Sequence, residues 1–132
     1  MRNELPRGPV YPVVTMRVLV VEDDVALADS VGEALRLRGH DVVVAMTGQA
    51  ACEVVSDFQP EVALVDVRLP DIDGVTLVGL LRGYMAEQPL RVVGFSSPEK
   101  SLEAGGRHHL FDTWVSKPSD IETIERALAD RD

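Results

Sequence analysis

Five short apolar runs alternate with longer segments of helical period, and this alternation limits the possible folds more than any other feature of the chain. The runs are predicted strands: Arg17 to Val21, Asp41 to Ala45, Glu61 to Val65, Arg91 to Phe95 and Thr113 to Ser116. The middle runs are nearly continuous in Val, Leu and Ala, which is typical of strands covered on both faces. The pattern predicts an α/β domain with a doubly wound, five-stranded parallel sheet in a three-layer α/β/α arrangement.

Spacing and end signals predict the helices between these strands. Asp24 is well placed to cap the first helix, and Gly39 stands where that helix would end. Thr47 is a candidate cap for the second helix, and the third is expected to begin around Gly74.

The last two helices carry less uniform signals. Ser97 and Pro98 form a good cap and first turn for a fourth helix, but Gly105 and Gly106 interrupt it early. We therefore expect the fourth helix to be short or mobile. Ser119 lies three residues before a glutamate, which is the spacing of a capping box for the final helix.

A chain of 132 residues, 45% of them hydrophobic, is long enough for one domain with a real core and too short for two ordinary domains. Residues 1–15 contain three prolines and no apolar period, so we expect a flexible N-terminal extension before a domain at 16–132. The chain ends near the expected end of the last helix, and no DNA-binding domain is visible. A stand-alone protein and a piece of a longer one both fit.

The charge of the chain argues against two classes of partner. Its formal net charge is -9, which disfavours nonspecific attraction to nucleic acid or to anionic membrane surfaces. No apolar run is long enough to span a bilayer, and the single cysteine cannot form an intramolecular disulfide. The cytoplasm is therefore the expected location.

Polar residues close the apolar runs abruptly. Glu22 and Asp23 follow the first run, Asp66 the third, Ser96 the fourth and Lys117 the fifth. The carboxyl ends of parallel strands meet at one edge of a sheet, where α/β proteins of this kind bind their ligands. The sequence thus predicts a single site at this edge.

The acids of this predicted site need a counter-charge. Two unit charges about 4 Å apart repel by about 4 kcal/mol at an effective dielectric constant of about 20, so Asp23 and Asp66 would not both stay ionised unaided. A divalent cation resolves the conflict, and oxygen ligands suit Mg²⁺. The alternative for Asp66 is a helix cap or turn residue. Asp71 and Asp73 lie in a Pro and Gly segment, where turn chemistry explains them.

Lys117 and Ser96 complete a pocket for an anion. Lys117 would point into the acidic pocket, although an exposed lysine of no consequence is the alternative, and Ser96 can donate a hydrogen bond to an anionic oxygen. A metal, carboxylates, a lysine and a hydroxyl together fit phosphoryl transfer to Asp66, which would form an aspartyl phosphate.

The segments "VVEDD", "LVDVRLPDIDG", "GFSS" and "WVSKP", taken in this order, resemble the receiver domain of two-component response regulators. The resemblance runs from about Met16 to the C-terminus. It implies a flavodoxin-like fold with the strand order 2-1-3-4-5. It also implies a protein that is not an enzyme beyond catalysing its own phosphotransfer and dephosphorylation.

The same resemblance implies roles for the pocket residues. Asp66 matches the phosphoacceptor and Asp23 a direct Mg²⁺ ligand. Glu22 would act on the metal through water, and Arg68 would supply a backbone carbonyl.

It also implies a switch. Ser96 matches the Ser/Thr switch residue, and Lys117 the phosphate-contacting lysine, with a cis peptide bond to Pro118. Trp114 matches the aromatic switch, although an ordinary core or surface tryptophan is the alternative.

The implied partners are a histidine kinase or histidine phosphotransfer protein, and a downstream effector on the face of the fourth helix, fifth strand and last helix. No direct contact with nucleic acid or membrane is expected. Two other functions stay open. One is a receiver-like interaction module that signals without phosphorylation. The other is a Mg²⁺-dependent phosphatase of the haloacid-dehalogenase type, which wants a second aspartate where Arg68 stands.

Overall fold

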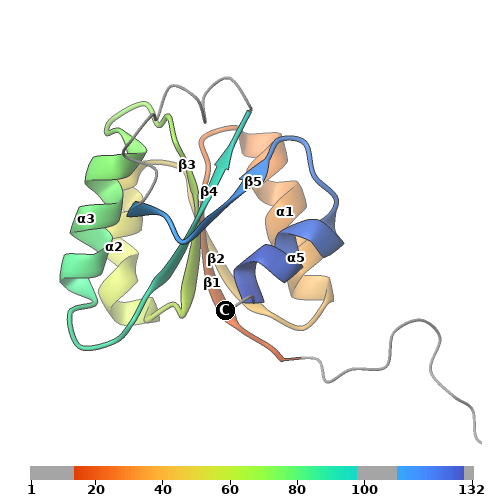
Figure 1. Ribbon diagram of the computed structural model, residues 1–132, viewed down its shortest axis with the longest axis horizontal. Coiled ribbons are helices and arrows are strands. Elements are labelled where there is room, and N and C mark those ends of the chain that lie inside the picture. The colour runs from red at the N-terminus through yellow and green to blue at the C-terminus, as the bar shows by residue number, and fades with distance from the viewer. Residues whose placement is uncertain (1–13, 98–109, 130–132) are drawn as a thin grey trace, which may run out of the picture.

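Five parallel strands form the central sheet in the order β2-β1-β3-β4-β5 (Figure 1). The computed structural model describes residues 14–97 and 110–129. The strands are β1 (Arg17–Val21), β2 (Asp41–Ala45), β3 (Val62–Asp66), β4 (Arg91–Ser96) and β5 (Thr113–Ser116). The predicted fold and strand order are confirmed. Three boundaries move by one residue: β3 begins at Val62 and ends at Asp66, and β4 ends at Ser96.

Helices cover both faces of the sheet. They are α1 (Val25–Leu37), α2 (Gly48–Phe58), α3 (Gly74–Tyr84) and α5 (Ile121–Ala129). Figure 1 shows α1 and α5 on one face and α2 and α3 on the other. The fourth helix predicted from Pro98 falls on 98–109, outside the described residues, as does nearly all of the predicted extension at 1–15.

The core lies in two layers because side chains alternate along each strand. In β1, Leu19 and Val21 join the apolar cluster that contains Ala51, Val55 and Leu77 of α2 and α3. The intervening Val18 and Val20 join the cluster that contains Val31, Leu35, Ile124 and Leu128 of α1 and α5. The near-continuous apolar runs of the sequence therefore reflect burial on both faces of the sheet.

Local side-chain caps set the starts of three helices. The Asp24 carboxylate accepts a hydrogen bond from Leu27 N at 3.1 Å, and Thr47 Oγ1 accepts one from Ala50 N at 3.0 Å. Asp73 caps α3 in the same way, through Thr76 N. Residue 39 adopts a φ of 97° after α1, a conformation that favours glycine.

The predicted cap of the last helix is wrong by one residue. The Asp120 carboxylate, not the Ser119 hydroxyl, accepts a hydrogen bond from Thr123 N, at 2.8 Å. The Ser119 hydroxyl instead donates to Ser116 O at 2.6 Å. Because α5 begins at Ile121, Asp120 occupies the capping position and Ser119 belongs to the preceding turn.

A buried histidine ties α5 to the start of the sheet. Met16 N donates to Nδ1 of His40 at 3.0 Å, so the opposite ring nitrogen carries the proton and donates to Glu125 of α5 at 2.6 Å. Arg38 also pairs with Glu125, at 2.8 Å. Burial alone would raise the pKa of Glu125, but its bonds to Arg38 and His40 outweigh burial and lower it. The helix is thus held on the sheet by charge as well as by its apolar face.

Within residues 14–97 and 110–129, no helix has the length and apolar character that crossing a membrane requires.

Replacing Asp120 by Ala should lower the free energy of unfolding, because the first turn of α5 loses its N-cap acceptor. Ser119→Ala is the matched control and should cost less, because its hydroxyl bonds a turn carbonyl rather than a helix amide. Urea unfolding at pH 7 measures both. A larger loss for Ser119→Ala would restore the capping role to Ser119.

Candidate functional site

Three carboxylates meet at the carboxyl edge of the sheet. Glu22 and Asp23 follow β1, and Asp66 ends the neighbouring strand β3. The register of the two strands sets Val21 beside Val65, so the residues that follow each of them lie side by side. One carboxylate oxygen from each acid lies within 4.8 Å of the others. Glu22 and Asp66 are buried, while Asp23 is exposed.

Lys117 is the cation of this cluster. Its Nζ lies 2.7 Å from Glu22 Oε1 and 3.3 Å from Asp66 Oδ2, and 5.1 Å from the centre of the Phe95 ring. The peptide bond from Lys117 to Pro118 is cis, as predicted. Burial alone would lower the pKa of Lys117, but its close ion pair with Glu22 and the attraction of Asp66 outweigh burial, so the pKa is raised. Lys117 therefore keeps its charge inside the pocket.

Burial in this cluster disfavours the ionised form of Glu22. Burial raises its pKa, and Lys117 offsets the shift only in part. Its Oε2 accepts a hydrogen bond from Asp24 N at 3.0 Å. Its Oε1 is fully buried and, despite the nearby Lys117 Nζ, has no aligned hydrogen-bond partner among the described residues. A buried oxygen of this kind calls for a further partner, such as a water or an ion.

The acids suit a hydrated Mg²⁺ ion. Mg²⁺ takes oxygen ligands, usually from one or two carboxylates, and keeps several of its waters. Asp23 and Asp66 offer such oxygens, and Glu22 Oε1 offers an acceptor for a metal-bound water. The residues present therefore fit a magnesium site.

The loop from β3 to α3 packs closely on Asp66. Arg68 N donates to Asp66 Oδ1 at 3.0 Å, and Arg68 pairs with Asp73 in an antiparallel bridge. A side chain at Gly74 would lie only 3.0 Å from the carbonyl oxygen of Asp66. The Arg68 backbone is thus held at the rim of the acidic cluster.

Ser96 lies at the same edge of the sheet. It is buried at the end of β4, and its hydroxyl donates to the carbonyl of Ser97 at 2.7 Å.

The indole of Trp114 lies against the backbone of β4. Trp114 of β5 pairs with Gly94 in the parallel register, and a Cβ at Gly94 would be 2.5 Å from the indole. The Phe111 ring lies beside it, 4.6 Å away between ring centres. Sequence reasoning missed Gly94, although a glycine inside an apolar strand is a known sign of close approach.

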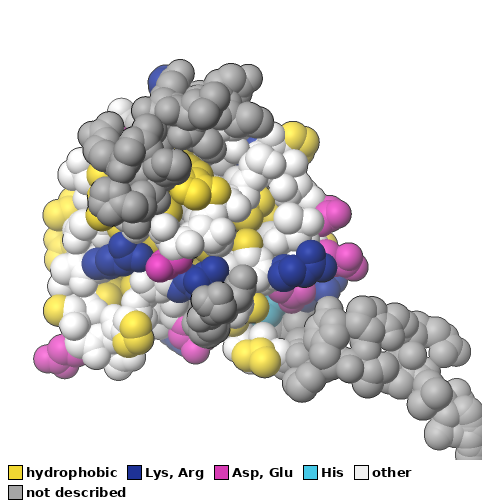
Figure 2. Space-filling model, viewed as in Figure 1, with side chains coloured by type: hydrophobic (Ala, Val, Ile, Leu, Met, Phe, Trp, Pro, Cys, Tyr) yellow, Lys and Arg dark blue, Asp and Glu magenta, His cyan; other side chains and the backbone are white. Residues whose placement is uncertain are grey.

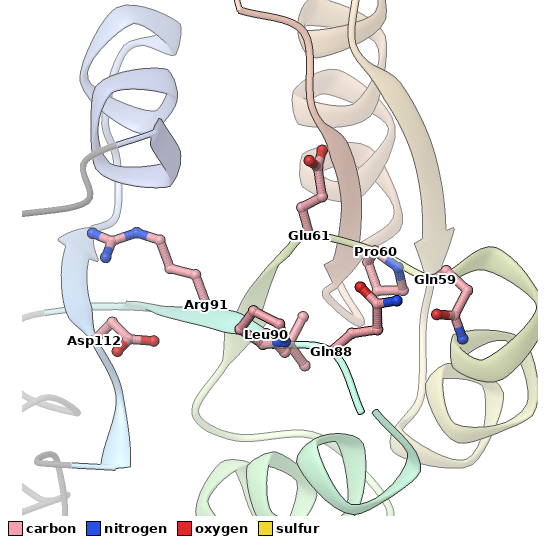
Figure 3. A pocket seen from close by; sticks show the side chains of 8 residues that line it. Gln59, Pro60, Glu61, Gln88, Leu90, Arg91 and Asp112 are labelled. Carbon is pink, nitrogen blue, oxygen red and sulfur yellow. The ribbon is translucent and has the colours of Figure 1, made fainter. Parts of the chain in front are cut away.

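A separate hollow of about 450 Å³ lies at the opposite edge of the sheet (Figure 3). Its charged side chains already have partners within the protein. Glu61 accepts from Arg17 N, Asp112 pairs with Arg82, and Arg91 donates to Ala127 O. The hollow therefore offers little for chemistry.

The outer surface mixes both signs of charge. Figure 2 shows basic side chains next to acidic ones on the face that carries β4, β5 and α5. Arg82 pairs with Asp112 at 2.9 Å and Arg38 with Glu125 at 2.8 Å. On this face the basic side chains of the described residues are therefore interspersed with acidic ones.

Comparison with known proteins assigns a family to this arrangement. Residues 18–129 match the family described as the response regulator receiver domain. Among curated relatives, the transcriptional regulatory proteins KdpE and PrrA of Mycobacterium tuberculosis are 31% identical over 105 residues and 33% identical over 107 residues. These matches cover 76% and 78% of this chain but 44% and 46% of the relatives. The chain thus spans less than half the length of these two relatives.

A solved structure supports the same assignment. The receiver domain (CheY-like) from Methylobacillus flagellatus has a TM-score of 0.78 and is 31% identical, and the match covers 87% of this chain and 97% of that one.

Replacing Glu22 by Gln should raise the free energy of unfolding by about 1 kcal/mol at pH 7 in metal-free buffer, because a poorly compensated buried charge is removed. The folded pKa of Glu22 is raised, so its contribution to stability is fully present below the ordinary value of 4.5 and is lost as pH rises through the folded pKa. The advantage of the variant should therefore vanish below pH 4.5.

Urea unfolding over a pH series tests this, with the exposed Glu33→Gln as control. A variant that is less stable than the wild type at pH 7 would contradict the electrostatic account of Glu22.

Proposed function

Because the chain belongs to the response regulator receiver domain family, whose members generally act as signalling switches, we propose that it is a Mg²⁺-dependent phosphoacceptor switch. Asp66 takes the phosphoryl group. The observation that carries this proposal is the buried Asp66 carboxylate, clustered with Glu22 and Asp23 and 3.3 Å from Lys117 Nζ.

Four residues would hold the metal. Asp23 and Asp66 bind it directly, Glu22 acts through a water, and Arg68 contributes its backbone carbonyl. Mg²⁺, when bound, neutralises charge on the oxygens of the transferring phosphoryl group.

The phosphoryl donor is the phosphohistidine of a histidine kinase or of a histidine phosphotransfer protein. One Asp66 oxygen forms a bond to phosphorus while the phosphorus–nitrogen bond breaks and the donor imidazole leaves. Arg68 N holds Oδ1 of Asp66, whereas Oδ2 faces Lys117, which favours Oδ2 as the attacking atom. Lys117 then contacts the phosphoryl oxygens and balances their charge.

Ser96 and Trp114 respond to the charge of the phosphoryl group on Asp66. The Ser96 hydroxyl exchanges its bond to the Ser97 carbonyl for one to a phosphoryl oxygen. This movement changes the packing around Trp114 and so alters the face that includes β5 and α5, where a downstream effector protein binds. The protein catalyses only its own phosphorylation and dephosphorylation.

The two other functions open from the sequence have less support. A phosphatase of the haloacid-dehalogenase type requires an aspartate two positions after its nucleophile, and here Arg68 lies two positions after Asp66. An interaction module that signals without phosphorylation has no need of a fully buried Glu22 oxygen without an aligned partner.

Asp66→Asn should reduce labelling by acetyl phosphate and Mg²⁺ to about 1% of wild type or less, because the nucleophile is lost. Intact-protein mass spectrometry measures the adduct, which hydroxylamine should remove from the wild type. Asp29→Asn, an exposed change in α1, is the control. Labelling of folded Asp66→Asn at the wild-type rate would refute the assignment.

Trp114 is the only tryptophan, so its fluorescence reports directly on the proposed switch. Beryllofluoride with Mg²⁺ should give a saturable change in the wild type. Gly94→Ala should shift the emission to longer wavelength, because the added Cβ overlaps the indole and displaces it toward solvent. A wild type that stays silent while folded, and is not labelled by acetyl phosphate, would favour the interaction module.

A further inference from the structure

The Asp71 carboxylate binds the first turn of a helix distant in sequence. Its Oδ1 accepts from Gly48 N and its Oδ2 from Gln49 N, both at 2.9 Å. These two backbone bonds lower the pKa of Asp71. Amides in the first turn of a helix have no partner within the helix, so α2 needs an acceptor from outside. Here the acceptor comes from the loop between β3 and α3.

Ile72 strengthens the same contact through packing. A Cβ on Gly48 would lie only 2.1 Å from Cγ2 of Ile72. The Ile72 side chain therefore occupies the space that any larger residue at position 48 would fill. Two adjacent residues of the loop thus contact one turn of α2, the first by hydrogen bonds and the second by van der Waals contact.

The other end of this loop belongs to the acidic site. The Arg68–Asp73 bridge closes the loop at its base, and residues 69–72 form its tip. At the base, Arg68 N donates to the carboxylate of Asp66. The loop is thus fixed at the base by Asp66 and the bridge, and at the tip by α2. Without the contacts of the tip with α2, the loop would move about the Arg68–Asp73 bridge, and the Arg68 backbone would shift with it.

We propose that Asp71 is a positioning residue for the metal: by fixing the loop tip on α2, it holds the Arg68 carbonyl where Mg²⁺ binds. This rests on the proposed function, in which Arg68 supplies that carbonyl. Coupling between two sites is reciprocal, so Mg²⁺ binding must in turn stabilise the contact between Asp71 and α2.

The chain offers a matched control. Thr47 caps the same helix through Ala50 N but makes that contact from the α2 side rather than from the loop. Asp71→Ala and Thr47→Ala both remove an acceptor from the first turn of α2. Only Asp71→Ala releases the loop tip, so a difference in metal affinity between them isolates positioning from helix stability.

Calorimetric titration of the metal-free proteins with MgCl₂ is the first test. Asp71→Ala should weaken Mg²⁺ binding roughly tenfold, the lower end of the loss seen when a residue supporting a metal ligand is removed. Thr47→Ala should stay within about twofold of the wild type. Asp71→Asn keeps one acceptor oxygen and should recover part of the affinity.

Amide hydrogen exchange is the second test, and it does not depend on activity. Saturating Mg²⁺ should slow exchange at Gly48 and Gln49 in the wild type and have no such effect in Asp71→Ala. Gly48→Ala displaces Ile72 without removing a hydrogen-bond acceptor and should weaken Mg²⁺ binding in the same direction. If Asp71→Ala does not fold, Gly48→Ala tests the same positioning role.

The possible failures can be told apart. A folded wild type that binds no Mg²⁺ overturns the proposed function, and this inference with it. A wild type that binds Mg²⁺, together with equal affinities for Asp71→Ala and Thr47→Ala, overturns the positioning role alone. Unchanged Gly48 and Gln49 exchange on adding Mg²⁺ to the wild type does the same.

Discussion

Two buried carboxylates share one lysine at the sheet edge, and the site depends on this unequal balance of charge. Glu22 and Asp66 both face Lys117, and the exposed Asp23 adds a third negative charge within the same cluster. Opposite unit charges about 4 Å apart attract by about 4 kcal/mol at an effective dielectric constant of about 20, and like charges repel by a similar amount. One lysine therefore does not balance three carboxylates. The remaining negative charge favours a cation. The parallel sheet enforces the crowding, because adjacent strands end side by side.

Most of the fold and the centre of the site were predictable because their signals are local. Apolar runs marked each strand, a polar residue closed all of them except β2, and the carboxyl ends of parallel strands share one edge of the sheet. Side-chain caps such as Asp24 and Thr47 act within three residues, so the sequence alone predicted them. The wrong cap at α5 shows the limit of a local signal. Ser119 and Asp120 are adjacent residues of types that both cap helices well, and the bond of the Ser119 hydroxyl to the Ser116 carbonyl decides between them.

Apart from the cap of α5, the contacts that sequence reasoning missed join distant parts of the chain. Asp71 looked like an ordinary turn residue because its partners lie more than twenty positions away, in α2. Gly94 had meaning only once the strand register set it beside Trp114. His40, between Met16 and Glu125, is a third case. Periodicity shows which side of an element is buried, but it does not identify the element that covers it.

The packing of Trp114 bears on how a signal would leave the site. An indole that lies on Gly94 and beside Phe111 already has close contacts, so any change of its position must break them. In the proposed switch, movement of Ser96 would have to supply enough free energy to loosen a packed aromatic pair, which is worth about 0.5 to 1.5 kcal/mol beyond its buried area. If Trp114 moves as proposed, Gly94 would raise the free energy that the movement requires, because it lets the indole pack closely on β4.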